Sequence, residues 1–120
     1  MTIIYIASSK SIHSARWIRF FSLKKKNKII WINTSHPNKE TINEFNELKS
    51  IVKIYNLKNI HDLFKIITTL LFGKYSLVHI HYLGWHSLLT LFIRPKSNLI
   101  LTPWGSDLLI NNYALKKLWL

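Results

Sequence analysis

Apolar and polar positions along this chain form two alternating patterns. Short runs rich in β-branched residues are too brief for helices and predict buried strands. Between them lie longer stretches with apolar residues three or four positions apart, which predict helices. The expected strands cover residues 2–7, 28–33, 51–55, 77–81 and 98–102, and the expected helices cover 13–23, a short segment near 42–48, 59–72, 84–93 and 107–120.

Strands that alternate with helices favour right-handed crossovers and a parallel sheet covered on both sides. The expected fold is α/β, a Rossmann-like parallel sheet of about five strands with helices on both faces. If the strand order is 3-2-1-4-5, ligands bind at the carboxyl ends of the strands, in a crevice between the first and fourth. The walls of that crevice are then the loops Ser8–Ser14, Tyr82–His86 and Pro103–Asp107.

Two helix ends carry residues typical of caps. Ser11 or Ser14 is available as the N-cap of the helix expected over residues 13–23. Gly73 follows the helix expected over 59–72 and suits a left-handed C-cap.

The length of 120 residues allows one domain, spanning residues 1–120. The absence of cysteine excludes a disulfide framework and agrees with a reducing compartment. No apolar run reaches the roughly 20 residues of a membrane span, and the N-terminus lacks the basic region and cleavage pattern of a signal peptide. A cytoplasmic location is therefore expected.

Positive charge dominates the chain, with 17 basic and five acidic residues and a formal charge of +12. Such a balance attracts nucleic acid, anionic lipid or phosphorylated substrates without choosing among them. The alternative is that lysines in solvated positions, such as Lys24–Lys26, reflect coding composition or solubility.

The loop after the first strand gathers hydroxyl and basic side chains at a helix N-terminus. Ser8, Ser9, Lys10, His13 and Arg16 lie within it or just beyond it. Free backbone N–H groups and the positive end of the helix dipole favour a phosphate or carboxylate here. The alternative is that the serines only cap the helix and Arg16 is solvated.

Two kinds of site are not expected. The first loop lacks the G-x-G-x-x-G turn of a dinucleotide fold, and no Walker loop occurs, so a self-contained NAD or ATP site is not predicted. His79, His81 and His86 have the spacing of imidazole ligands but no acidic residue nearby, so we expect hydrogen-bonded core residues rather than a metal site. His81, at the end of its strand, remains a candidate for contact with a ligand.

The last loop, Thr102–Asp107, combines a rigid turn, a flat aromatic ring, a glycine and possible helix caps. An aromatic face beside hydrogen-bonding groups suits a sugar ring. The alternative is that Trp104 packs inward and Asp107 caps the last helix.

Four segments together, in order and spacing, resemble the N-terminal domain of glycosyltransferase family 4: Ile4–Ser8, His13–Trp17, Val78–Gly84 and Thr102–Leu108. The resemblance implies a GT-B fold, in which two Rossmann-like domains face a cleft and the N-terminal one mostly holds the acceptor. Family members transfer a sugar from a nucleotide sugar with retention of configuration, and they need no metal or other cofactor for the transfer. They commonly build lipopolysaccharide, capsule or other cell-surface glycans.

The resemblance also implies which residues bind substrate. It places the loop from Ser8 to His13 at the interdomain cleft, and Trp104 stands where many relatives have histidine. The expected substrate-binding residues are Ser8, Ser9, His13, Arg16, His81, Tyr82, Gly84, Trp104, Gly105, Ser106 and Asp107.

The family's donor-binding C-terminal domain has no counterpart in these residues, so we expect an incomplete GT-B N-terminal domain with negligible activity alone. Its partners would be a nucleotide sugar, a glycan or lipid-linked acceptor, the missing C-terminal domain and an anionic membrane surface at the inner face of the membrane. The alternatives are a small basic nucleic-acid-binding module, suggested by charge and by Trp17, Trp31 and Trp85, or a regulatory α/β domain. A nucleic-acid partner is not expected because no recognised motif is present.

Overall fold

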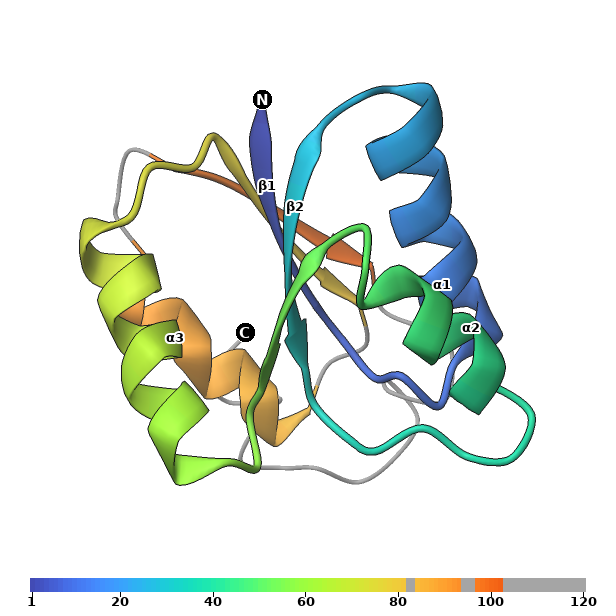
Figure 1. The fold of residues 1–120 in the computed structure, drawn as a ribbon. Helices are drawn as coiled ribbons and strands as arrows, with labels where there is room; N and C mark the ends of the chain where they lie inside the picture. The colour runs from blue at the N-terminus through green and yellow to red at the C-terminus, as the bar shows by residue number, and fades with distance from the viewer. Residues whose placement is uncertain (82–83, 94–96, 103–120) are drawn as a thin grey trace.

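The five expected strands form one sheet in the computed structural model, which describes residues 1–81, 84–93 and 97–102. All neighbouring strands are parallel, and their order is β3-β2-β1-β4-β5 (Figure 1). The α/β class and the predicted strand order are therefore confirmed. The strands are β1 (Thr2–Ala7), β2 (Lys28–Asn33), β3 (Lys53–Asn56), β4 (Leu77–His81) and β5 (Asn98–Thr102).

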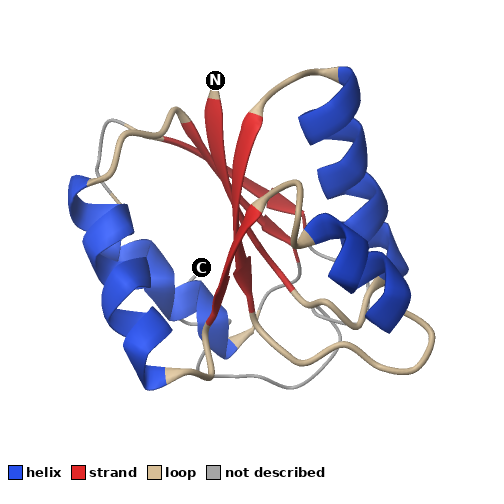
Figure 2. Cartoon of the chain, viewed as in Figure 1, coloured by secondary structure: helices blue, strands red, loops and turns tan. Residues whose placement is uncertain are grey.

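Helices cover both faces of the sheet (Figure 2). One face carries α1 (Ile12–Arg19), the π-helical turn η1 (Phe20–Lys24) that continues it, and α2 (Ile42–Leu48). The other face carries α3 (Ile60–Phe72) and the 3₁₀ helix η2 (Trp85–Phe92).

Alternation along β1 divides the core into two layers. Ile4 and Ile6 join a buried cluster with Ile66 and Leu70 of α3. Tyr5 and Ala7 point to the opposite face and join a second cluster with α1 and α2. Because successive strand residues point to opposite sides, one apolar strand supplies both layers.

An ion-pair network ties α1 to α2. The guanidinium of Arg19 donates from Nε to Glu44 and from Nη2 to Glu47, each at 2.7 Å. These contacts fix the two helices against each other at the surface.

Two expectations, one about a strand boundary and one about a helix cap, need correction. The third strand begins at Lys53 rather than 51, because the amides of Ile51 and Val52 both bond to the Leu48 carbonyl and extend the turn after α2. The short helix expected over 84–93 is confirmed and is the 3₁₀ helix η2. Gly73 has φ −69°, not the left-handed conformation predicted.

Glycine is required at position 73 for space. A Cβ there would collide with the carbonyl oxygen of Thr69 in the last turn of α3.

The helix expected over 107–120 lies outside the described residues. No helix within the described ranges combines the length and apolarity that a membrane span requires.

Candidate functional site

The carboxyl ends of β1 and β2 bring two polar loops together at the lower edge of the sheet in Figure 1. Ala7, the last residue of β1, lies beside Asn33, the last residue of β2. In parallel sheets this edge is where ligands bind. The candidate site is therefore built from the segments that leave these two strands.

The loop after β1 is held by side chains of the second strand and its following turn. The Ser9 amide donates to Asn33 Oδ1 at 2.9 Å, and the Ser9 hydroxyl donates to the Ser35 carbonyl at 2.5 Å. The hydroxyls of Ser8 and Ser35 also hydrogen-bond to each other. With Ser9 and Asn33 both buried, the loop has a defined conformation before any ligand arrives.

Asn33 is the centre of this network. Its Nδ2 donates to Asn56 Oδ1 at 3.0 Å, and the Asn56 amide in turn donates to Asp62 Oδ2 at 2.9 Å. Hydrogen bonds thus connect the loop after β1 through the ends of β2 and β3 to the first turn of α3.

An open pocket of about 360 Å³ lies over this loop and is lined by Ser8, Lys10, Ser11, Ile12 and His13. It is positioned at the N-terminus of α1, where amide N–H groups have no partner within the helix. Ser11 occupies the N-cap position but makes no side-chain cap bond. Within the described residues its buried hydroxyl has no hydrogen-bond partner.

Of the two candidate caps, Ser11 is the N-cap residue of α1, although its side chain makes no cap hydrogen bond, and Ser14 is not the cap. Ser14 is fully buried, and its hydroxyl lies 3.2 Å from His81 Nδ1. The uncapped amides and the nearby Lys10 give the pocket a positive character, which suits an anionic group.

His81 links three elements beneath this pocket. Its Nδ1 lies 2.6 Å from the hydroxyl of Tyr5 on β1 as well as close to Ser14 on α1. His81 as a whole is only 5% exposed. A direct ligand contact for His81 stays a prediction, and the observed contacts favour a supporting role.

His79 lies in an aromatic cluster on the same sheet face. Its ring meets the edges or faces of Tyr5 and Trp17 at centroid distances of 5.1 and 4.9 Å. Burial, and secondarily the proximity of His81, lowers the pKa of His79 from its ordinary 6.5 to about 4. His79 is therefore neutral at physiological pH, as a core histidine should be.

Comparison with known families agrees with this arrangement. The profile of a family described as glycosyl transferase 4-like matches residues 2–118. The chain belongs to this family. Comparison with curated proteins and with solved structures found no match. The suspected relation to glycosyltransferase family 4 is confirmed, and the chain is a glycosyltransferase-type domain whose family acts on sugar donors and acceptors.

Within this glycosyl transferase 4-like domain, the structure brings only some of the predicted site residues together. Ser8 and His13 line the pocket together, while Ser9 is buried and bonded to Asn33 and Ser35. Arg16 is exposed on α1 and is not among the pocket-lining residues. Gly84 lies near the His86 ring, which a Cβ would approach to 3.0 Å. Outside the described residues lie Tyr82, Trp104, Gly105, Ser106 and Asp107.

Sequence reasoning missed the contribution of the second strand. It placed the crevice between the first and fourth strands, but the loop after β1 is bonded to Asn33 and Ser35 at the end of β2. The sequence feature that could have revealed this contribution is a run of polar residues: Asn33 ends an apolar strand, and Thr34 and Ser35 follow it.

Two of the three tryptophans that suggested nucleic-acid binding, Trp17 and Trp31, pack in or against the core, and the side chain of Trp85 lies outside the described part of the structure. Trp31 is fully buried and donates from Nε1 to the Ala7 carbonyl. Trp17 stacks on both Tyr5 and Phe21 at 4.3 Å. Neither ring is available as the open platform on which bases stack.

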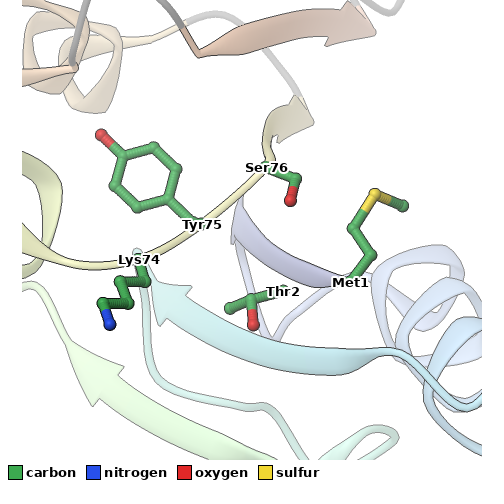
Figure 3. Close-up of a pocket in the computed structure, with 5 residues that line it drawn as sticks. All are labelled: Met1, Thr2, Lys74, Tyr75 and Ser76. Carbon is green, nitrogen blue, oxygen red and sulfur yellow. The ribbon is translucent and has the colours of Figure 1, made fainter.

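A second pocket, of about 430 Å³, lies at the opposite end of the strands. Met1, Thr2, Lys74, Tyr75 and Ser76 line it, and their side chains point in different directions (Figure 3). The Tyr75 hydroxyl is already bonded to the Leu70 carbonyl at 2.5 Å. This pocket lacks the converging polar groups of a binding site.

No cluster of three or more metal-ligating side chains occurs in the described ranges.

Proposed function

We propose that this chain is the acceptor-side N-terminal part of a nucleotide-sugar-dependent glycosyltransferase that builds cell-surface glycan of the lipopolysaccharide or capsule type. The observation that carries the proposal is the family match over residues 2–118. The parallel sheet supports it by placing a pocket at the carboxyl edge, where the family resemblance expects the interdomain cleft. Its reaction partners are a nucleotide sugar and a glycan or lipid-linked acceptor.

The pocket over the β1 loop has the chemistry to hold a phosphate or a sugar hydroxyl. Ser8 supplies a hydroxyl, Lys10 supplies a cation, and the start of α1 supplies backbone donors. The Asn33 network holds these donors in place, so little ordering is required when a ligand binds.

Binding is tested by titrating the ¹⁵N-labelled chain with millimolar uridine, guanosine and cytidine diphosphate sugars and following amide resonances. We expect shifts concentrated at residues 8–13, and about five- to tenfold weaker binding for Lys10→Ala, because a charge-assisted contact is lost. Lys39→Ala, an exposed lysine before α2, should bind like the parent chain. Shifts scattered away from residues 8–13, or equal losses in the two variants, would contradict the proposed site.

The same proposal predicts no detectable sugar transfer by these 120 residues alone. The family resemblance assigns donor binding to a C-terminal domain, so the charges that would stabilise a departing nucleoside diphosphate are not supplied. The measurement is nucleoside diphosphate release from the same sugars, with an active two-domain glycosyltransferase as positive control. Steady turnover by the chain would show that it is a complete catalyst.

We further propose a cytoplasmic location at the inner face of the membrane, where lipid-linked acceptors are presented. The formal charge of +12 supports this, because anionic lipid attracts basic proteins.

A further inference from the structure

Helix α3 exposes an unusual amount of apolar side chain on its outer side. Ile60, Phe64 and Phe72 are 70%, 72% and 78% exposed, and Leu71 is also exposed. Its opposite side is buried through Ile66 and Leu70. The exposed set is therefore a second apolar face that the core does not use.

The helical repeat places these residues in two adjacent rows. Ile60, Phe64 and Leu71 follow spacings of four and seven, so they share one side of the helix. His61, Lys65, Thr68 and Phe72 form the neighbouring row by the same rule. Since 13 residues extend about 20 Å, this face runs the length of the longest helix in the described part of the chain.

The neighbouring helix η2 adds to the same layer. It packs beside α3 over one face of the sheet (Figure 1), and its Leu88 and Leu91 are exposed. We define the outer surface made by Ile60, Phe64, Leu71, Phe72, Leu88 and Leu91 as the α3 face. Soluble monomers rarely expose a large contiguous apolar patch without a partner.

Charge around the α3 face selects the kind of partner. Lys58, Lys65 and Lys74 are exposed before, along and after the helix. The acidic residue of this helix, Asp62, is only partly exposed and accepts the Asn56 amide. Apolar side chains flanked by lysines match an anionic bilayer, in which rings enter the acyl boundary and ammonium groups remain at the phosphates.

We propose that the α3 face docks this domain onto an anionic lipid surface with α3 lying flat in the interface. The inference deepens the proposed function by naming the surface of the domain that meets the membrane. It rests on that function only in assuming that the acceptor is presented at a membrane. The pocket belongs to the loop that leads into α1 on the other side of the sheet. Docking through α3 therefore leaves the pocket open to substrates.

Site-specific labelling tests the orientation directly, because the chain contains no cysteine. Phe64→Cys and Leu23→Cys place a nitrobenzoxadiazole dye on opposite faces, since Leu23 lies in η1 and is 51% exposed. With vesicles of phosphatidylcholine and phosphatidylglycerol, we expect a blue shift and stronger emission at position 64 only. A response at position 23 alone, or equal responses, would overturn the proposal.

Co-sedimentation with the same vesicles gives the matched measurement. Phe64→Ser combined with Phe72→Ser should weaken vesicle binding by about tenfold or more, and Phe20→Ser combined with Leu23→Ser should leave it unchanged. Binding should fall as salt rises and be much weaker with phosphatidylcholine alone.

Three further results would overturn the proposal: no binding to anionic vesicles, equal losses in both double variants, or self-association through Phe64 and Phe72 without lipid binding. No sugar substrate enters these assays, so their failure leaves the nucleotide-sugar titration as a separate test of the proposed function.

Discussion

Replacing Asn33 with alanine is expected to lower the free energy of unfolding by about 2–3 kcal/mol, because buried polar groups lose their partners. The Asn33 side chain is 2% exposed and bonds to both the Ser9 amide and Asn56 Oδ1. Without it, the Ser9 N–H lacks an acceptor and the loop that lines the pocket loses its anchor to β2. Urea unfolding measures the loss, and the nucleotide-sugar titration should show weaker binding.

Two further variants separate the loop anchor from general destabilisation. Asn46→Ala changes an exposed asparagine on α2 and should alter stability by less than about 0.5 kcal/mol. Asn56→Ala removes one Asn33 partner but leaves the Ser9 contact, so hydrogen exchange at the Ser9 amide should stay slow. Fast exchange at Ser9 is expected in Asn33→Ala only. Slow exchange there would mean that Asn33 does not anchor the loop.

The sheet was predictable because its central strands β1, β2 and β4 are buried on both faces and therefore read as nearly continuous apolar runs. The first, second, fourth and fifth strands have the expected bounds. The third does not, because hydrogen bonds to Leu48 compete for residues 51 and 52. Local competition of this kind leaves no trace in hydrophobic spacing.

The site was only partly predictable because its contacts join residues distant in sequence. The β1 loop was recognised from its serines and basic residues, but its attachment to Asn33 depends on the register that places Ala7 beside Asn33. Ser14 had the sequence signature of a cap, yet its hydroxyl meets His81, 67 positions away. Helix-capping preferences describe local partners, and here a tertiary partner replaces the local one.

The low pKa of His79 predicts that the domain loses stability in mild acid. Its pKa is about 4 in the folded chain against an ordinary 6.5, so the unfolded chain takes up this proton first as pH falls. The contribution of neutral His79 to the free energy of unfolding is complete above about pH 6.5 and is lost as the pH falls to about 4. A difference of this size corresponds to at most about 3 kcal/mol.

His79→Phe isolates that contribution from other groups that titrate in the same range. A phenylalanine can occupy the space beside Tyr5 and Trp17 and has no proton to bind. We expect the free energy of unfolding of the variant to fall less than that of the parent chain between pH 6.5 and 4, by up to about 3 kcal/mol.

The matched control is Asn46→Ala, at an exposed position on α2, which adds or removes no titratable group and should preserve the parent pH dependence. Urea unfolding at half-unit pH steps gives the three curves. The physical reason for the expected difference is desolvation: protonation of His79 would place a charge beneath α1 with His81 nearby and little water to solvate it. If His79→Phe and the parent chain lost stability in parallel, His79 would be protonated in the folded domain and the aromatic cluster would be more hydrated than its geometry implies.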